Sequence, residues 1–418
     1  MNLRNLLETR IDKDAERPFV YFRDQIIDFL TLDRKVNRAS NAFREVGVTK
    51  GDTVCIFLTN CLEFLYLWFG LAKIGAVMVP LNTRHHGEDL QYIINHSDAK
   101  WIIVDEQFYP AYATIEEGLT HIRHQIWRSE AAPPPKGFIS LSNLLEGANE
   151  KGPPAQDIKD GDPLGIIYTS STPEMLKGVT ISHFNYINTG HTWAHDVIHC
   201  TEEDMFLTAL PLFDANTQMF TVMGSLCSGR PFVLKERFSV FHFIDEVRQS
   251  RATVFNHIEE MLHSLLKNTR QGSGFGNSSR ATFGRVLPPE VRKEVENRYH
   301  VTCIEGYGHI ESGGLCLFTT DGDHKPGSIG KPTGFCQVAI WDQNNQEVPR
   351  GETGEIVVKE IVPHTLFLGY YKQPDKTAEA LEGGAFDTGD AGYEDEDGYF
   401  YIVGRTKDYS RRHGETIL

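Results

Sequence analysis

The stretch from Phe386 to Asp408 reads FDTGDAGYEDEDGYFYIVGRTKD and is the most informative part of the sequence. It combines a Thr-Gly-Asp turn, an acidic hairpin and an apolar strand that ends in Gly404-Arg405. Residues opposite each other on two antiparallel strands lie close together. The pattern therefore predicts Asp390 and Arg405 at the ends of neighbouring strands. A carboxylate beside a guanidinium suits the two hydroxyl groups of a ribose.

The same stretch resembles the signature of the adenylate-forming superfamily, which includes acyl-CoA synthetases, adenylation domains of peptide synthetases and luciferases. In that superfamily the aspartate of TGD holds the ribose hydroxyls, and the arginine of GRxKD contacts the ribose. The resemblance implies these roles for Asp390 and Arg405, and it implies that Asp408 is the hinge before a small C-terminal domain. Since the sequence stops at Leu418, we expect that domain to be missing.

A hydroxyl-rich loop with one lysine follows the apolar run GIIY. It reads TSSTPEMLKG over Thr169–Gly178 and leads through VTISH into a helical pattern. Backbone N–H groups, hydroxyls and a point charge in such a loop can surround phosphate oxygens. The loop resembles YTSGTTGxPKG of the superfamily position for position. This resemblance implies that the phosphates are bound by Thr169, Ser170, Thr172 and Lys177.

Three substitutions in this loop disfavour ATP binding. Ser171 replaces a glycine of the usual pattern, and a non-glycine residue forced to positive φ is destabilised by roughly 1–2 kcal/mol. Pro173 lacks a backbone donor, and Glu174 brings a negative charge near the phosphates. We therefore expect weaker ATP binding than the usual pattern gives.

A second nucleotide motif is predicted at Glu305–Glu311, where EGYGHIE resembles EGYGxTE of the superfamily. The resemblance implies that the nucleotide is bordered by Gly306, Tyr307 and Gly308. It implies that Glu311 ligates Mg²⁺, a hard cation that prefers carboxylate and phosphate oxygens. Ile310 stands where a threonine contacts the α-phosphate, and losing a hydrogen bond to a charged group costs about 1.5–3 kcal/mol. We therefore predict that Ile310 reduces turnover without abolishing it.

The acyl pocket is predicted from Ala209–Asp214, ALPLFD, which resembles the PLFH motif of the superfamily. In that motif the aromatic residue or the histidine gates the pocket. Phe213 is the aromatic residue here, and Asp214 stands where histidine is usual. By the same resemblance Asn256 and His257 continue along the pocket. For Phe213 alone, a core residue at the end of a strand is the alternative interpretation.

Other matches indicate the fold more than the chemistry. Gly284–Val291, GRVLPPEV, is similar to GGAPLPPEV, whose backbone borders the adenine, although Arg285 and Val286 depart from the smaller or stiffer residues usual there. Further landmarks at 327–332, 351–356 and 369–374 are typical of turns and packing.

The order of elements predicts an α/β fold. From about Leu32 helical periodicity alternates with short apolar runs, which favours mostly parallel sheets, and after Gly330 short alternating strands favour an antiparallel β part. With the resemblance, we expect the large N-terminal domain of the acyl-CoA synthetase fold, with two α/β subdomains and a small distorted β-barrel subdomain. The expected boundaries are 1–330 for the α/β AMP-binding subdomains, 331–404 for the β-rich subdomain and 405–418 for the start of the hinge.

Composition excludes several classes of protein. The 418 residues carry a net charge of −16, which disfavours a nucleic-acid binder. Seven cysteines without a CxxC pair indicate neither a disulfide framework nor a zinc ribbon and favour the cytoplasm. The most apolar stretch, Val54–Pro80, is interrupted by polar residues, so it is predicted as strand, helix, strand rather than an integral membrane segment.

These motifs together predict an ATP-dependent acid–thiol ligase. ATP and a small-molecule carboxylic acid would give an acyl-AMP and pyrophosphate with the help of Mg²⁺, and CoA or a carrier-protein thiol would then attack. The sequence looks most similar to the medium-chain or carnitine/crotonobetaine-type CoA ligases of the superfamily. Two alternatives stay open, namely a binding or regulatory homologue without turnover and an N-terminal fragment of a longer ligase. The oligomeric state is also open, a homodimer included.

Overall fold

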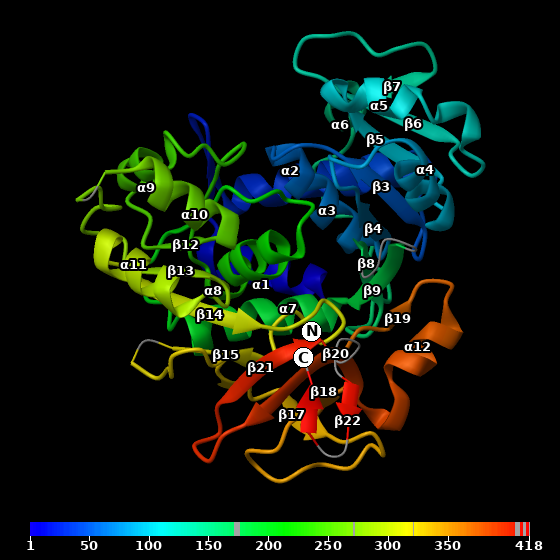
Figure 1. Cartoon of the computed structure of the whole chain (residues 1–418). Coiled ribbons are helices and arrows are strands. Elements are labelled where there is room, and N and C mark those ends of the chain that lie inside the picture. The colour runs from blue at the N-terminus through cyan, green and yellow to red at the C-terminus, as the bar shows by residue number, and fades with distance from the viewer. Residues whose placement is uncertain (171–175, 271, 321, 406–409, 413–414, 418) are drawn as a thin grey trace.

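Three large β-sheets organise the described part of the chain, and β22 (Ser410–Arg412) and β23 (Glu415–Ile417) form a fourth, two-stranded sheet. The structure is a computed structural model, and it describes residues 1–170, 176–270, 272–320, 322–405, 410–412 and 415–417. Two large sheets of eight and nine strands form two α/β parts, and a four-stranded sheet forms a third, β-rich part. Figure 1 shows the β-rich part, coloured orange to red, below the two α/β parts.

The eight-stranded sheet has the order β19-β9-β8-β4-β3-β5-β6-β7. Its strands are β3 (Thr53–Phe57), β4 (Val77–Pro80), β5 (Trp101–Asp105), β6 (His124–Arg128), β7 (Phe138–Ser140), β8 (Pro163–Ser170), β9 (Leu176–Ser182) and β19 (Gly369–Tyr370). From β8 to β7 neighbouring strands are parallel, whereas β8, β9 and β19 pair antiparallel. The helix α3 (Leu62–Ile74) connects β3 to β4. The predicted order strand, helix, strand over Val54–Pro80 is therefore confirmed.

The nine-stranded sheet has the order β16-β15-β14-β13-β12-β10-β11-β1-β2. Its strands are β1 (Pro18–Phe22), β2 (Gln25–Asp28), β10 (Phe206–Thr208), β11 (Phe232–Leu234), β12 (Val254–Asn256), β13 (Ala281–Arg285), β14 (Thr302–Tyr307), β15 (Leu317–Phe318) and β16 (Lys331–Pro332). The strands from β1 to β14 in this order are parallel. Parallel strands end at the same edge of a sheet, where open α/β sheets bind ligands. The motifs that follow β10, β12, β13 and β14 are therefore gathered at one edge.

Helices cover the two large sheets. They are α1 (Leu3–Asp14), α2 (Phe29–Glu45), α3, α4 (Gly87–His96), α5 (Tyr109–Ala113), α6 (Leu141–Gly147), α7 (His183–Thr192), α8 (Met223–Ser228), α9 (Phe243–Ser250), α10 (Glu259–Asn268), α11 (Pro289–Tyr299) and α12 (Pro374–Ala380). α2 and α3 pack closely because Gly70 lacks a side chain; a Cβ there would lie 2.8 Å from Ala39 Cβ. Within the described ranges no helix has the length and apolar character needed to cross a membrane.

The β-rich part differs from the prediction in one respect. Its strands β17 (Cys336–Trp341), β18 (Gly354–Glu360), β20 (Phe386–Glu394) and β21 (Phe400–Arg405) form an antiparallel sheet in the order β17-β18-β20-β21. The predicted distorted barrel is wrong for the described residues, since these four strands do not close. The neighbouring short strands β16 and β19 belong to the nine-stranded and eight-stranded sheets, and Phe400 of β21 forms an isolated bridge with Gly330. The predicted boundaries at 330 and 404 stay predictions.

Candidate active site

Asp390 joins the β-rich part to the end of β14. It is the cross-strand partner of Arg405, as the sequence predicts, although Asp390 lies in the middle of β20 rather than at its end. Arg405 Nη1 lies 2.7 Å from Asp390 Oδ1. Tyr307 Oη donates to Asp390 Oδ2 at 2.8 Å, and His309 Nε2 lies 3.1 Å from the same oxygen. Side chains from β14, from the loop after it and from β21 therefore converge on one buried carboxylate.

These contacts set the charge of Asp390. Burial alone would raise the pKa of Asp390, but hydrogen bonds from His309, Tyr307 and Arg405 lower it to about 2. Burial raises the pKa of the Tyr307 phenol. At neutral pH Asp390 is thus an ionised acceptor and Tyr307 a neutral donor. A fixed carboxylate of this kind is suited to accept hydrogen bonds from ligand hydroxyls.

A cavity of about 640 Å³ opens beside this cluster. It lies where β8, β13 and β14 end and where the segment after β10 begins. Six residues predicted from four separate motifs line it: Thr169, Asp214, Gly306, Gly308, Glu311 and Arg405. Arg285 and His309 line it as well. Residues far apart in the sequence thus meet around one space large enough for a nucleotide portion and a small second ligand.

Glu311 and Lys177 are connected through Tyr370 of β19. Tyr370 Oη donates to Glu311 Oε1 at 3.0 Å, and Lys177 Nζ lies 4.4 Å from the centroid of the Tyr370 ring. The backbone oxygen of Glu311 accepts from Phe367 N at 2.9 Å. The ring face attracts the ammonium group, and the hydroxyl orients the carboxylate. One aromatic residue therefore positions both predicted catalytic side chains.

We expect Tyr370→Phe to lower the rate of the acyl-adenylate formation predicted from the sequence about tenfold, because Glu311 loses a hydrogen bond to its charged group. The phenyl ring keeps its contact with Lys177, so the change isolates the hydroxyl. Pyrophosphate exchange into ATP, measured over a range of Mg²⁺ concentrations, reports the effect. Tyr371→Phe is the matched control, since Tyr371 Oη donates to Asp98 Oδ2 at 3.2 Å. Equal rates for the two variants would contradict the role of Tyr370.

The segment Thr169–Gly178, predicted as a phosphate loop that leads into a helix, connects two paired strands instead. β8 continues to Ser170 and β9 begins at Leu176, so the two strands form a hairpin in which Thr169 pairs with Lys177. Thr169 Oγ1 is buried and makes no hydrogen bond with the described residues. Buried polar atoms are normally satisfied, so this hydroxyl fits a ligand oxygen. The predicted site residue Thr172 lies outside the described residues, as do Ser171, Pro173, Glu174 and the hinge residue Asp408.

The four residues predicted for the acyl pocket occupy different places. Asp214 lines the cavity described above, whereas Phe213 lines a second one. Asn256 and His257 are fully buried at the end of β12. Asn256 Nδ2 donates to Oδ1 of the cavity residue Asn216 at 2.5 Å. Burial lowers the pKa of His257 to about 3, and its Nδ1 lies 2.8 Å from Thr282 Oγ1, so it is a neutral buried group behind the cavity wall.

Some residues of the site carried little signal in the sequence. His309 occupies the variable position of EGYGxTE, so the motif predicts nothing about it. Tyr370 lies in GYYKQP, a segment whose pattern predicts a turn and packing rather than a site residue. Asn216 follows the acyl-pocket motif by two residues. In each case the sequence offered one indication of a site residue, namely a polar or aromatic residue inside a motif or next to it.

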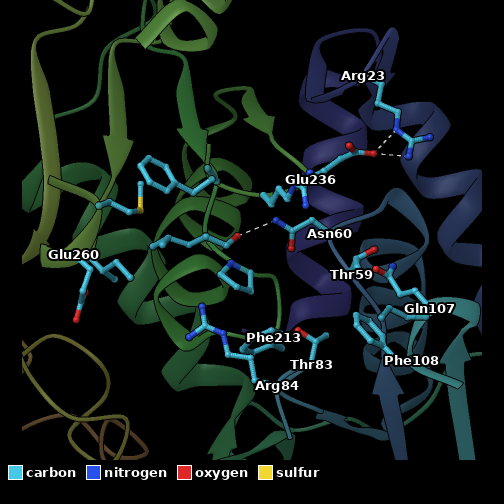
Figure 2. A pocket seen from close by; sticks show the side chains of 18 of the residues that line it. Arg23, Thr59, Asn60, Thr83, Arg84, Gln107, Phe108, Phe213, Glu236 and Glu260 are labelled. Carbon is cyan, nitrogen blue, oxygen red and sulfur yellow. Dashed lines mark hydrogen bonds and ion pairs between the residues drawn. The ribbon is translucent and has the colours of Figure 1, made fainter. Parts of the chain in front are cut away.

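A second cavity of about 700 Å³ lies between the two α/β parts (Figure 2). Asn60 spans the junction, since its Nδ2 donates to Leu210 O at 2.9 Å and to Lys235 O at 2.8 Å. At the rim Arg23 is paired with Glu236 and Glu130, and Figure 2 shows the first of these contacts. Two further arginines line the cavity and form no ion pair with the described residues: Arg84 and Arg237.

Comparison with known proteins agrees with this architecture. A model of the AMP-binding enzyme family matches residues 7–371. Together with the α/β fold and the cavity lined by the nucleotide motifs, this match shows the class of protein. The chain belongs to the AMP-binding enzyme family. The crotonobetaine/carnitine–CoA ligase of Salmonella enteritidis PT4 is 34% identical over 393 residues, which are 93% of this chain and 76% of the relative.

Two solved structures are similar in fold and sequence. The inhibitor-bound N-terminal domain of FACL13 from Mycobacterium tuberculosis is 25% identical with a TM-score of 0.87, and the match covers 97% of this chain and 99% of that domain. ATP-bound MatB from Rhodopseudomonas palustris is 26% identical with a TM-score of 0.86, and the match covers 100% of this chain and 82% of that one. The described part of the chain therefore has the N-terminal domain fold of the acyl-CoA synthetases.

Proposed function

We propose that this chain catalyses the ATP-dependent activation of a carboxylic acid as an acyl-adenylate, for transfer to the thiol of CoA. The observation that carries the proposal is the cavity of about 640 Å³ in which Thr169, Glu311 and Arg405 meet, with Asp390 directly behind Arg405. Membership of the AMP-binding family supports it, as do a Salmonella relative that is a CoA ligase and a similar structure that holds ATP.

Different residues bind the nucleoside and the phosphates of ATP. Asp390 and Arg405 hold the ribose hydroxyls, and Tyr307 lies on the adenine side. The phosphates are held by Thr169, Ser170, Thr172 and Lys177. An oxygen of the acid attacks the α-phosphorus and pyrophosphate leaves; the CoA sulfur then attacks the acyl carbon and AMP leaves. Cationic groups fixed in advance stabilise the charge that develops on the phosphate oxygens.

Glu311 fits a magnesium ion. Its Oε1 accepts from Tyr370, and its Oε2 accepts no hydrogen bond from the described residues, so one oxygen remains for a cation. Carboxylate and phosphate oxygens are the ligands that Mg²⁺ prefers. When bound, the ion would neutralise part of the triphosphate charge.

The second cavity suits CoA. The phosphates of CoA would match the guanidinium groups of Arg84 and Arg237, which form no ion pair with the described residues. Ile258 lines both cavities, and the neighbours Phe213 and Asp214 line one each. A thiol entering from the second cavity would thus reach the adenylate near these residues. A carrier-protein thiol, a homodimer and a cytoplasmic location stay predictions.

Pyrophosphate exchange into ATP across a panel of carboxylic acids tests the proposal. We expect exchange above the acid-free background with at least one acid. Saturable ATP binding with no exchange for any acid would instead favour a binding homologue without turnover. The CoA step is tested by the release of AMP when CoA is added, compared with pantetheine, which lacks the phosphates.

A further inference from the structure

We propose that Arg285 binds the α-phosphate of the nucleotide in the cavity of about 640 Å³ and stabilises the charge on that phosphate when the acid attacks it. The inference rests on the proposed function and adds one residue to it. It starts from a change in the segment GRVLPPEV, in which Arg285 departs from the smaller residue of the resembling motif. The arginine brings a positive charge to the end of β13.

The strand β13 directs the side chain of Arg285 into the cavity. Arg285 is the last residue of this strand and its exposed one. A Cβ on Gly284 would lie 2.5 Å from His257 Nε2, so the buried histidine fills that face of the strand. Successive side chains of a strand point to opposite faces, and Phe283 and Arg285, two residues apart, both line the cavity. The cross-strand partner of Arg285 is Gly306, which has no side chain to contact the guanidinium group.

Arg285 is the basic residue of this cavity that has no anionic partner among the described residues. Arg405 and His309 also line the cavity, and both contact Asp390. No hydrogen bond or ion pair joins the side chain of Arg285 to a described residue. Burial raises the pKa of Asp214, and the charge of Arg285 opposes this effect from beyond ion-pair distance. The guanidinium group is therefore available to a ligand anion.

Among the anions of the proposed reaction, the α-phosphate fits this position. Arg405 is proposed at the ribose, and the α-phosphate is the phosphate bonded directly to that sugar. Asp214 and Glu311 line the same cavity and repel an anion, while the apolar side chain of Ile310 offers it no donor. A guanidinium group presents paired N–H donors that match phosphate oxygens. Arg285 therefore supplies positive charge where the other lining side chains do not.

The contact acts in the first half of the proposed reaction. An oxygen of the acid forms a bond to the α-phosphorus, the bond from this phosphorus to the bridging oxygen breaks, and pyrophosphate leaves with the electron pair. Arg285 remains protonated throughout and donates hydrogen bonds to the non-bridging oxygens. A cation held in place before the reaction stabilises the charge that develops on these oxygens.

Binding of AMP and of adenosine tests the contact without turnover, because the two ligands differ only in this phosphate. Titration calorimetry at constant ionic strength in the presence of EDTA removes any contribution of a metal ion. We expect Arg285→Gln to weaken AMP binding about tenfold and to leave adenosine binding within about twofold of wild type. Arg285→Lys keeps the charge and should recover part of the AMP affinity. Arg34→Gln is the matched control, since Arg34 is exposed on α2 and forms no ion pair with the described residues.

Several results would overturn the proposal. Equal losses for AMP and adenosine in Arg285→Gln would place the guanidinium group on the base, and unchanged AMP affinity would exclude the contact. Wild-type protein that binds AMP no better than adenosine would also contradict it. In pyrophosphate exchange we expect Arg285→Gln to lower kcat about tenfold, and an unchanged kcat would contradict the catalytic role. If no acid supports exchange, the proposed function fails, whereas a loss of AMP affinity confined to Arg285→Gln still supports the phosphate contact.

Discussion

Asp390→Ala is expected to lower kcat/KM for ATP about 100-fold in pyrophosphate exchange. The alanine removes the acceptor for the ribose hydroxyls and leaves Arg405, Tyr307 and His309 without their shared partner. A hydrogen bond to a charged group contributes about 1.5–3 kcal/mol, and each 1.4 kcal/mol is a factor of ten. Initial rates measured over a range of ATP concentrations separate the effect on KM from that on kcat.

Two further variants make this result interpretable. Asp387→Ala removes a carboxylate from the same strand, where Asp387 Oδ1 accepts only from Gly389 N among the described residues, at 2.7 Å. We expect it to stay within about threefold of wild type, since an exposed carboxylate contributes little. Arg405→Ala combined with Asp390→Ala should lose less than the sum of the two single losses, because the pair acts as a unit. A loss in Asp387→Ala as large as in Asp390→Ala would contradict the assignment.

The sequence was sufficient to predict the pairing of Asp390 with Arg405. Both lie in one hairpin, so their register depends on local turn chemistry and alternation. The contacts of Tyr307 and His309 with the same carboxylate could not be predicted from local pattern. They arise because β20 of one sheet lies against the end of β14 of another, and the variable position of a motif carries no information about such a contact.

The predicted acyl pocket shows a second limit of prediction from sequence motifs. The C-terminal end of β12 brings Asn256 and His257 to the expected edge of the sheet, yet both are buried behind the wall. Phe213 and Asp214 are neighbours in the chain and line different cavities. A motif predicts the edge at which residues gather, but which side chain reaches the cavity depends on packing against other elements. β19 likewise pairs with β9, which lies far away in the sequence, so its partner cannot be predicted from local pattern.

The largest expected effect on stability is that of Arg292→Ala. Arg292 Nη1 lies 2.6 Å from Glu305 Oε2, and Glu305 Oε1 accepts from Leu287 N at 2.9 Å. Both charged side chains are buried. Removing one partner of a buried pair leaves an uncompensated charge, so we expect the free energy of unfolding to fall by about 3–5 kcal/mol. Urea-induced unfolding followed by far-UV circular dichroism measures the change.

The double variant Arg292→Ala with Glu305→Gln tests the cause. Glutamine keeps a side-chain oxygen that can accept from Leu287 N and carries no charge, so the double variant should recover most of the stability lost in Arg292→Ala. No recovery would mean that the loss comes from packing of the arginine stem. Glu305 is the first residue of the nucleotide motif, and its contact with Leu287 ties β14 to the segment after β13. Because Arg285 of β13 and Gly306 of β14 line the cavity, recovered stability should be accompanied by recovered ATP affinity.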